Sequence, residues 1–240
     1  MRVIYLNFKK LVYILSISAM IIVTFTLSLS MYNQTLEVLS LPTTGKVVVI
    51  DPGHGGEDPG AVSPGGTEES HINLAVAKRL KEYLEQDGTV VIMTREDDSG
   101  LYEKGGTFRQ RKRQDLERRR QIVIDSNADL FVSIHVNKFP QSKYYGAQTF
   151  YLAGDKEAER LAKIIQARLI EVLDRNNKRQ AKASNDYYIL KNNNSVSVLV
   201  ECGFLSNPQE EELLKDARYQ DKIAWAIYTG IVEYLAGDPN

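Results

Sequence analysis

From residue 46 onward, short apolar runs alternate with longer segments whose apolar residues recur every three or four positions. The short runs are rich in β-branched residues, and several are apolar throughout, which is typical of strands covered on both faces of a sheet. They predict strands at residues 46–50, 89–94, 129–134, 147–152 and 196–201, with a weaker sixth at residues 187–190. The longer segments predict helices at residues 68–86, 156–174 and 219–235, and residues 109–126 are expected to form a strongly charged helix.

This alternation indicates βαβ units, in which helices connect parallel strands and cover the sheet. We therefore expect a single α/β domain over residues 46–236. It should be a three-layer fold, with a mostly parallel (mixed) sheet of about six strands and helices on both faces. The hydrophobic content of 43% is ordinary for a globular protein and is enough for one sizeable core.

The beginning of the chain has a different pattern. Residues 11–32 are apolar or small polar without a charge, and Arg2, Lys9 and Lys10 precede them. At 22 residues this segment is long enough to span a bilayer. Its basic end favours an orientation in which the rest of the chain is exported. Because no convincing small-x-small cleavage site follows, we expect residues 1–35 to be an uncleaved signal anchor, with a cleaved signal peptide as the alternative.

Residues 36–45 are then expected to be a linker to the exported domain. Removing the first 35 residues removes three basic residues and no acidic one, so the exported part is net acidic. A net acidic domain argues against general nucleic-acid binding. Cys202 is the only cysteine, which excludes an internal disulfide and means that the core must supply the stability.

Polar residues of metal-binding type lie at the ends of the predicted strands. His54 follows the first strand, His135 follows the third, and Glu201 ends the fifth. If these strands are parallel, the three side chains meet at the carboxyl edge of the sheet, where open α/β sheets bind ligands. Glu68 and Glu69 begin the first helix, on the connection that leaves the His54 loop. Two histidines with one or two carboxylates are the ingredients of a catalytic zinc site that keeps an open position for water.

Each of these residues also has a purely structural interpretation. A histidine in a Gly-rich turn or at a strand end is commonly a hydrogen-bonding residue, and acidic residues after Thr67 are what a helix N-terminus favours. Glu201 is harder to explain in this way, because a carboxylate that ends an apolar strand is destabilising unless it is paired or functional. The spacing of the residues matches no compact metal motif. The zinc hypothesis therefore depends on their convergence at one edge of the sheet.

Blocks of sequence along residues 46–236 resemble, in the right order, those of the zinc-dependent N-acetylmuramoyl-L-alanine amidases of the amidase_3 type. The blocks are VVIDPGHGGEDPGA, TEESHINLAVAKRL, the TR pair at residues 94–95, ADLFVSIHVN and VLVECGFLSNPQEE. The resemblance implies that His54, Glu69 and His135 bind zinc and that Glu201 is the catalytic acid/base. It also implies hydrolysis of the amide that joins the lactyl group of N-acetylmuramic acid to L-alanine in peptidoglycan.

The sequence departs from the family pattern in two places. The helix-opening block usually reads Glu-Lys, whereas here Glu69 precedes a serine and follows a second acid, Glu68. This leaves Glu68 as an alternative ligand, although the register favours Glu69. The family also commonly has a proline before the last block, where this chain has Val196.

The remaining reactive residues are assigned to structure. His71 lies two positions after Glu69 on the predicted helix, so the two side chains should point away from each other. Cys202 is adjacent to Glu201 on a strand and should face the core if Glu201 faces the site. Arg95 and Asn137 lie next to the site by the strand argument, and we expect them to contact substrate.

Residues 109–120 hold seven basic residues in twelve. They either attract anionic wall polymers or lipid head groups, or form a solvated helix face with pairing such as Asp115 with Arg119. Lys112 and Arg119 lie seven positions apart and can share one face of the helix.

The absence of appended wall-binding repeats makes the chain similar to the germination-specific amidases of spore-forming bacteria. Those enzymes act on cortex peptidoglycan together with a deacetylase to form muramic-δ-lactam. The expected partners are therefore peptidoglycan, a membrane through the N-terminal helix, and in one hypothesis an activating protein that orders the zinc site. The alternatives are a zinc peptidase that cleaves the stem peptide and a membrane-tethered wall-binding protein without catalytic activity.

Overall fold

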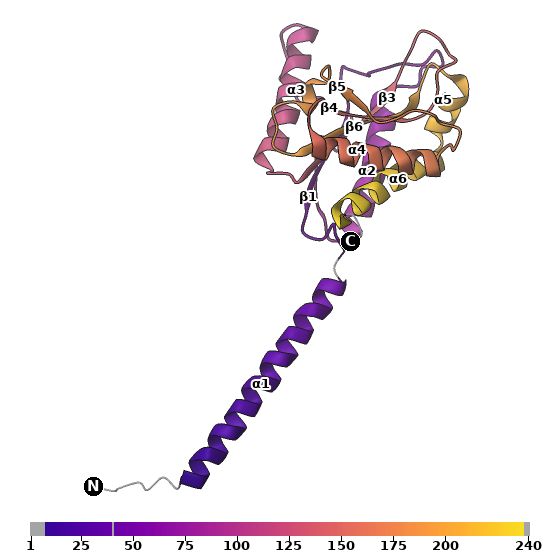
Figure 1. Cartoon of the computed structure of the whole chain (residues 1–240). Coiled ribbons are helices and arrows are strands. Elements are labelled where there is room, and N and C mark those ends of the chain that lie inside the picture. The colour runs from indigo at the N-terminus through magenta and orange to yellow at the C-terminus, as the bar shows by residue number, and fades with distance from the viewer. Residues whose placement is uncertain (1–7, 40, 238–240) are drawn as a thin grey trace. The chain divides into compact units, whose positions relative to one another are not determined.

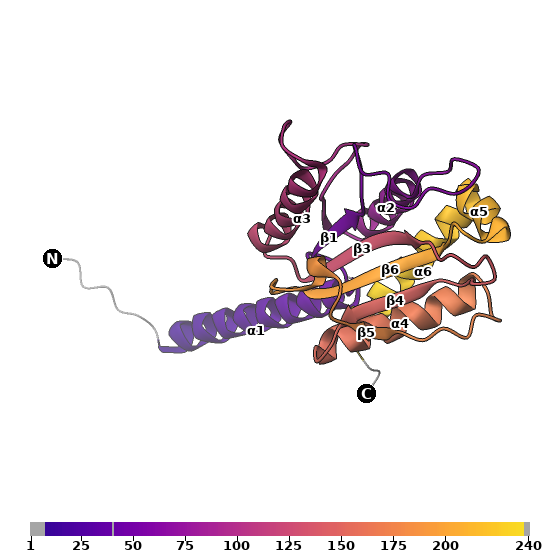
Figure 2. The same ribbon diagram turned by 90° about the horizontal axis from the view of Figure 1, so that it is seen from above.

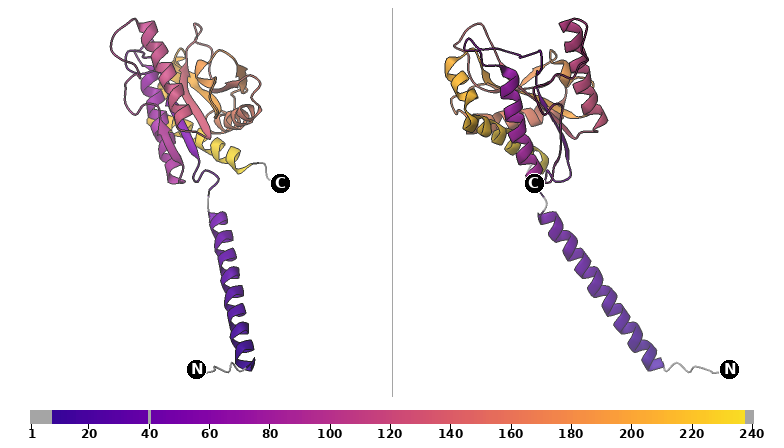
Figure 3. Two further views of the ribbon diagram at one scale, coloured as in Figure 1. Left: turned by 90° about the vertical axis from the view of Figure 1, so that its left-hand side faces the viewer. Right: turned by 180° about the vertical axis from the view of Figure 1, so that it is seen from behind.

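The computed structural model describes residues 8–39 and 41–237, with side chains omitted for residues 33–39. Its internal contacts divide the chain into two units, Met1–Leu41 and Pro42–Asn240. The first unit contains α1 (Phe8–Leu39), one continuous helix (Figure 3). Within its residues Phe8–Tyr32 the mean hydropathy reaches 2.2 over a window of 18 residues, and no side chain is buried. This stretch is long and apolar enough to cross a membrane, and a signal sequence has the same properties.

The second unit is built on a six-stranded mixed sheet, as the sequence predicts. Its order is β2-β1-β3-β6-β4-β5, and Figure 2 shows β1, β3, β6, β4 and β5 following one another across the sheet. All neighbouring strands are parallel except β4 and β6, which are antiparallel. The strands are β1 (Val47–Pro52), β2 (Val90–Met93), β3 (Leu130–Asn137), β4 (Gln148–Leu152), β5 (Lys182–Ser184) and β6 (Val196–Phe204).

Helices cover both faces of the sheet, so the predicted three-layer fold is confirmed. The larger core lies between the sheet and α2 (Glu69–Gln86), α4 (Lys156–Val172) and α6 (Ala217–Ala236). A smaller apolar cluster on the other face includes residues of α3 (Phe108–Asp125) and of the 3₁₀ helix η1 (Tyr188–Leu190). In Figure 1, α3 stands apart from α4 and α6. Only two of its residues, Arg119 and Val123, are buried.

The sequence prediction is wrong for the sixth strand. Residues 187–190 were expected to be a strand, but the structure forms η1 there, and the sixth strand is β5. Ile189 and Leu190 are both buried in the smaller cluster. Successive side chains of a strand would point to opposite faces, whereas a helical turn allows both to pack on the same side. β5 is a short strand with no apolar pattern, and among the described strands it pairs only with β4.

A further helix, α5 (Pro208–Lys215), was also absent from the sequence prediction. Asn207 is the N-cap of this helix, since its side chain accepts hydrogen bonds from the backbone N–H groups of Gln209 and Glu210. Pro208 occupies the first helical position, where its missing N–H has no effect on the hydrogen bonding.

Candidate metal centre and its supporting network

Three neighbouring parallel strands carry the predicted site residues to one edge of the sheet. His54 lies two residues beyond the end of β1, and His135 of β3 is paired in register with Glu201 of β6. Glu69 is the first residue of α2 and is 4% exposed. Residues separated by up to 147 positions in the chain therefore meet at the carboxyl edge, as the parallel arrangement requires.

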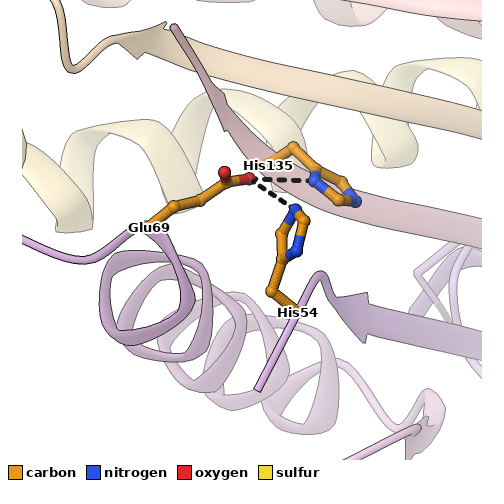
Figure 4. Close-up of side chains that lie close together, drawn as sticks. All are labelled: His54, Glu69 and His135. Atoms are coloured by element: carbon orange, nitrogen blue, oxygen red, sulfur yellow. Dashed lines mark hydrogen bonds and ion pairs between the residues drawn. The ribbon is translucent and has the colours of Figure 1, made fainter. Parts of the chain in front are cut away.

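The side chains of His54, Glu69 and His135 point toward one another (Figure 4). Glu69 Oε1 lies 2.9 Å from His135 Nδ1 and 3.4 Å from His54 Nε2. One ligand atom from each residue lies within 4.8 Å of the others. The carboxylate is held in place by backbone N–H groups, since Ala61 N donates to Oε2 and Val136 N donates to Oε1.

The Gly-rich turn after β1 is shaped by the need to present His54. The backbone of His54 is left-handed, with a φ of 64°, which is uncommon for a residue other than glycine. Gly53 lies directly against the ring of His135, and a Cβ atom at that position would lie only 2.2 Å from the ring. A glycine is thus required at this point so that the two imidazoles can approach each other.

Two buried arginines hold the carbonyl groups of this turn. Arg119 donates to Pro52 O (2.8 Å) and His54 O (2.7 Å). Arg95 donates to Pro52 O (2.9 Å) and Gly53 O (3.1 Å). Three consecutive carbonyls are therefore fixed by guanidinium groups, which present several donors in a rigid plane. This arrangement maintains the strained His54 backbone.

The guanidinium of Arg119 is itself held by carboxylates. It lies 2.7 Å from Asp51 Oδ1 and 2.6 Å from Asp115 Oδ2. Asp51 also accepts hydrogen bonds from Thr94 and Ser133, each at 2.7 Å. Burial opposes ionisation of Asp51, but the Arg119 charge and these hydrogen bonds outweigh it and lower the pKa of Asp51 to about 2.

The imidazole of His54 is oriented by a second carboxylate. His54 Nδ1 lies 2.9 Å from Asp58 Oδ2, and the same oxygen lies 3.0 Å from the ammonium of Lys112. Burial alone would lower the pKa of His54, but the hydrogen bonds with Asp58 and Glu69 raise it to about 9. In Glu69, burial opposes ionisation, and the hydrogen bonds of the two histidines nonetheless hold its pKa well below the usual range.

Glu201 is placed beside this group without joining it. Its side chain is 7% exposed, and Oε2 is buried with no hydrogen-bond partner among the described residues. Burial raises the pKa of Glu201 to about 7. A carboxyl group with such a pKa can accept and release a proton near neutral pH.

The donor set fits a zinc ion. Zinc is bound by imidazole nitrogen and carboxylate oxygen at about 2.0–2.2 Å, so its tetrahedral ligands lie roughly 3.3 Å apart. The separations of 2.9 and 3.4 Å around Glu69 Oε1 are close to this value. Asp58 on the far nitrogen of His54 is the kind of carboxylate that orients metal-binding histidines. The unsatisfied Glu201 oxygen also indicates a missing polar neighbour on this side.

The other sequence candidates lie away from this group. Glu68 is 39% exposed at its side chain and lies 3.8 Å from His71, which lies 3.2 Å from Asp98. Neither residue approaches the two site histidines, so the geometry favours Glu69 over Glu68 as the ligand. Cys202 is fully buried in the larger core, on the opposite face of β6 from Glu201, as the strand alternation predicts.

The environment of Arg95 favours a positioning role over the expected contact with substrate. The side chain is 3% exposed, and its guanidinium donates to the carbonyl groups of the His54 turn, of Ser70 and of Asp97. Asn137 ends β3 beside a register shift, and its backbone carbonyl accepts a hydrogen bond from Leu205. A substrate contact by the Asn137 side chain stays a prediction.

Several residues around the site were missed in the sequence. Asn73 donates to Gly53 O and to Glu69 Oε1. Its position one helical turn after Glu69 could have indicated this contact from the sequence. Asp58 lies four residues after His54, but a loop gives no periodicity from which a contact could be inferred.

The Asp115–Arg119 pair was expected, but the burial of Arg119 was not, because Arg119 lies within a basic segment. Tyr187 lies near Glu201, and burial together with that carboxylate raises the pKa of Tyr187.

Comparison with known proteins gives one consistent family. The sequence profile of the Amidase_3 family, described as N-acetylmuramoyl-L-alanine amidase, matches residues 48–233. The germination-specific N-acetylmuramoyl-L-alanine amidase of Bacillus subtilis is 43% identical over 210 residues, which covers 86% of this chain and 88% of that protein. The N-acetylmuramoyl-L-alanine amidase AmiA of Escherichia coli is 30% identical over 238 residues and covers 79% of this chain and 76% of its own.

Solved structures agree with these relatives. The CwlD amidase from Clostridioides difficile, solved in complex with the GerS lipoprotein, matches with a TM-score of 0.80 and 51% identity, covering 81% of this chain and all of that one. The catalytic domain of CwlV from Bacillus (Paenibacillus) polymyxa matches with a TM-score of 0.67 and 30% identity, covering 80% and 99% of the two chains. The shared region includes both histidines and both glutamates of the site.

Proposed function

Because the chain belongs to the Amidase_3 family and is an N-acetylmuramoyl-L-alanine amidase, we propose that its hydrolysis of peptidoglycan depends on zinc held by His54, Glu69 and His135. The observation that carries the proposal is the gathering of these three donors within 4.8 Å, with Glu201 on the neighbouring strand. A zinc ion bound there would supply Lewis-acid chemistry, activating water and polarising the substrate carbonyl.

The remaining parts of the mechanism are supplied by the protein. Asp58 holds His54 through Nδ1, which leaves Nε2 as its ligand atom. The backbone N–H of Ala61 holds one Glu69 oxygen, and the other oxygen faces the two imidazoles. These contacts preorganise the donors before any ligand binds, which reduces the reorganisation needed for catalysis.

Glu201 has the role of acid/base in this proposal. Its carboxylate takes a proton from the attacking water as the water oxygen bonds to the lactyl carbonyl carbon. It then transfers that proton to the nitrogen of L-alanine as the C–N bond breaks, so the amine leaves as a neutral group. The pKa of about 7, raised by burial, suits both transfers near neutral pH.

Four single variants of the full-length chain test the metal and proton-transfer roles. His54→Ala and His135→Ala should lose zinc, whereas Glu201→Gln should keep zinc and lose hydrolysis by about three orders of magnitude or more. Glu68→Gln, an exposed acid next to the site, is the matched control and should retain both. Zinc content is measured by atomic emission and turnover on purified muropeptides. Wild-type turnover in Glu201→Gln would refute the acid/base role.

The products of the same assay separate the amidase from a zinc peptidase. An amidase releases an intact peptide that begins with L-alanine, whereas a peptidase acting on the stem leaves at least one amino acid on the muramic acid. Mass spectrometry of the released fragments distinguishes the two. Shortened peptides from the wild-type chain would favour the peptidase.

We further propose that the substrate is the spore cortex and that the reaction prepares muramic-δ-lactam formation. The support is the 43% identity to the germination-specific amidase of Bacillus subtilis and the 51% identity to the Clostridioides difficile CwlD amidase. Deletion of the gene should yield a cortex without muramic-δ-lactam in its muropeptides. Restoration by the wild-type gene, and not by one encoding Glu201→Gln, would tie the lactam to this catalytic site.

The proposed location is the outer face of the membrane, with α1 as an uncleaved anchor. The support is the 25-residue apolar stretch Phe8–Tyr32. Membrane fractionation and the intact mass of the mature protein test this proposal. A mature chain that has lost the apolar stretch Phe8–Tyr32 would identify a cleaved signal peptide instead.

An activating partner is proposed on similar grounds. The Clostridioides difficile CwlD amidase was solved in complex with the GerS lipoprotein. If a corresponding protein assists this chain, zinc occupancy and turnover should be low in the isolated chain and rise when the partner is added. Full zinc occupancy of the isolated chain would contradict this requirement.

A further inference from the structure

A groove of about 470 Å³ lies between α3 and η1, next to the candidate metal centre. Its lining residues are Phe108, Arg109, Lys112, Arg113, Leu116 and Tyr188. Lys112 and Leu116 also line the small hollow of about 50 Å³ that reaches both site histidines. The hollow and the groove therefore lie next to each other and share two lining residues of α3.

The walls of this groove are apolar and already in place. Phe108 and Tyr188 are exposed by 48% and 40%, although large aromatic side chains are usually more buried. The hydroxyl of Tyr188 hydrogen-bonds to Glu117, and the guanidinium of Arg120 lies 5.9 Å from the centre of its ring. These contacts hold the tyrosine ring in position, so a ligand would not have to order it on binding.

The charges of α3 are distributed unevenly around the groove. Five of its seven basic residues pair with acids: Arg111 with Glu57, Lys112 with Asp58, Arg118 with Glu103, Arg119 with Asp51 and Asp115, and Arg120 with Glu117. Arg109 and Arg113 form no ion pair or hydrogen bond with any part of the chain that the structure describes. Both line the groove, and no acidic side chain lines it. The groove therefore combines apolar walls with two guanidinium groups that form no ion pair, although Arg113 is within electrostatic reach of Glu117.

We propose that this groove is the subsite for the peptide that leaves with L-alanine, and that Arg109 and Arg113 bind a carboxylate of that peptide. The inference rests on the amidase function proposed above. Guanidinium groups bind carboxylates through paired hydrogen bonds, and a glycan whose lactyl groups are all amide-linked to peptide offers no such anion. The aliphatic parts of the peptide would pack against Phe108, Leu116 and Tyr188.

The length of the groove indicates which part of the peptide reaches the arginines. Leu116 lies where the groove adjoins the hollow, and Arg109 lies seven residues earlier on the same helix. Seven residues of α-helix span about 10 Å, which is the length of roughly three residues of extended peptide. Measured from Leu116, the arginines therefore lie within reach of about three residues of the departing peptide.

The test uses the full-length, zinc-loaded chain and two synthetic substrates. Both are N-acetylmuramoyl tripeptides that begin with L-alanine, one with free carboxylates and one with every peptide carboxylate amidated. The double variant Arg109→Gln/Arg113→Gln should raise KM for the free acid about five- to tenfold and leave kcat unchanged. Its KM for the amidated substrate should stay within about twofold of wild type. Both positions are exposed and glutamine is a good helix former, so the variant should fold.

The matched control is Arg175→Gln/Arg218→Gln, which removes the same charge from two exposed positions outside the groove. It should leave both KM values unchanged. Equal KM increases for the two substrates, or the same increase in the control, would overturn the subsite, because either result would mean glycan binding or general charge attraction. A wild-type chain that binds zinc and hydrolyses neither substrate, even with its activating partner added, would overturn the amidase mechanism itself.

Discussion

Replacing Arg119 with methionine should disable the network that supports the metal centre. Arg119 is 1% exposed and donates to Asp51, Asp115 and the carbonyls of Pro52 and His54. Methionine keeps a similar length and helix propensity, so it removes the charge and the donors without opening a large gap. The main effect should be an Asp51 carboxylate that is buried without a counter-charge.

The size of the effect follows from the contacts that are lost. Removing one partner of a buried ion pair is destabilising by about 3–5 kcal/mol. The lowering of the Asp51 pKa from 3.8 to about 2 corresponds to about 2 kcal/mol of stability at neutral pH. The lost hydrogen bonds to the two carbonyls add about 1 kcal/mol each. We therefore expect the free energy of unfolding to fall by about 3–5 kcal/mol at pH 7.

The stability difference between the wild-type chain and Arg119→Met should depend on pH, whereas a simple packing defect would give a difference that is constant with pH. In the wild-type chain the Asp51 pKa is depressed, so its stabilisation is present above pH 3.8 and is lost as the pH falls toward about 2. In Arg119→Met the counter-charge is gone while burial remains, which raises the pKa of Asp51 above its ordinary value. The difference in stability between the two proteins should therefore shrink as the pH is lowered from 7 to 3.

Urea unfolding, followed by the fluorescence of Trp225, measures this effect in the full-length chain. Trp225 is the single tryptophan and lies in α6, so it reports on the catalytic unit. Arg118→Met is the control, because Arg118 is paired only at the surface with Glu103 and should contribute less than about 1 kcal/mol. Zinc affinity should also fall in Arg119→Met, since the His54 carbonyl loses its donor. A loss of under 1 kcal/mol, or one that is constant with pH, would refute the reasoning.

Three further predictions concern the site itself. Gly53→Ala places a Cβ about 2.2 Å from the His135 ring, so zinc affinity should fall at least tenfold. The affinity is measured by competition with a chelator, and an unchanged value would show that the turn can move aside. Asp58→Asn removes the carboxylate on His54 Nδ1 and should weaken zinc binding by about 10–100-fold in the same assay, whereas a change below threefold would exclude an orienting role. In the zinc-free chain the Glu201 pKa, raised by burial to about 7, should appear in a carboxyl-carbon NMR titration assigned with Glu201→Gln. Because the Glu201 carboxyl holds its proton more tightly in the folded state, the free energy of unfolding should fall as the pH rises from about 4.5 to 7. A measured Glu201 pKa near 4.5 would contradict this prediction.

Patterns within short stretches of sequence were sufficient for most of the fold. Five strands and four helices were predicted near their observed positions, because all of them except the charged helix α3 bury an apolar face whose period depends only on the local chain. The parallel order of β1, β3 and β6 then placed His54, His135 and Glu201 at one edge without any contact having been seen. The choice of Glu69 over Glu68 came from resemblance to a family.

Other features depended on contacts between distant parts of the chain. Seven basic residues within residues 109–120 look alike in sequence, yet Arg119 is buried against Asp51 while Arg109 and Arg113 line a groove. Which charge enters the core is decided by an acid 68 positions earlier, and no local pattern contains that information. The conformations of β5 and η1 also depend on the segments packed against them, since β5 has little apolar surface of its own and pairs with β4.

The sequence by itself determined the elements and the chemical types at their ends, because hydrophobic periodicity and residue identity are local properties. The tertiary structure alone decided which of those groups are buried, paired or free, because burial and pairing are properties of two segments brought together.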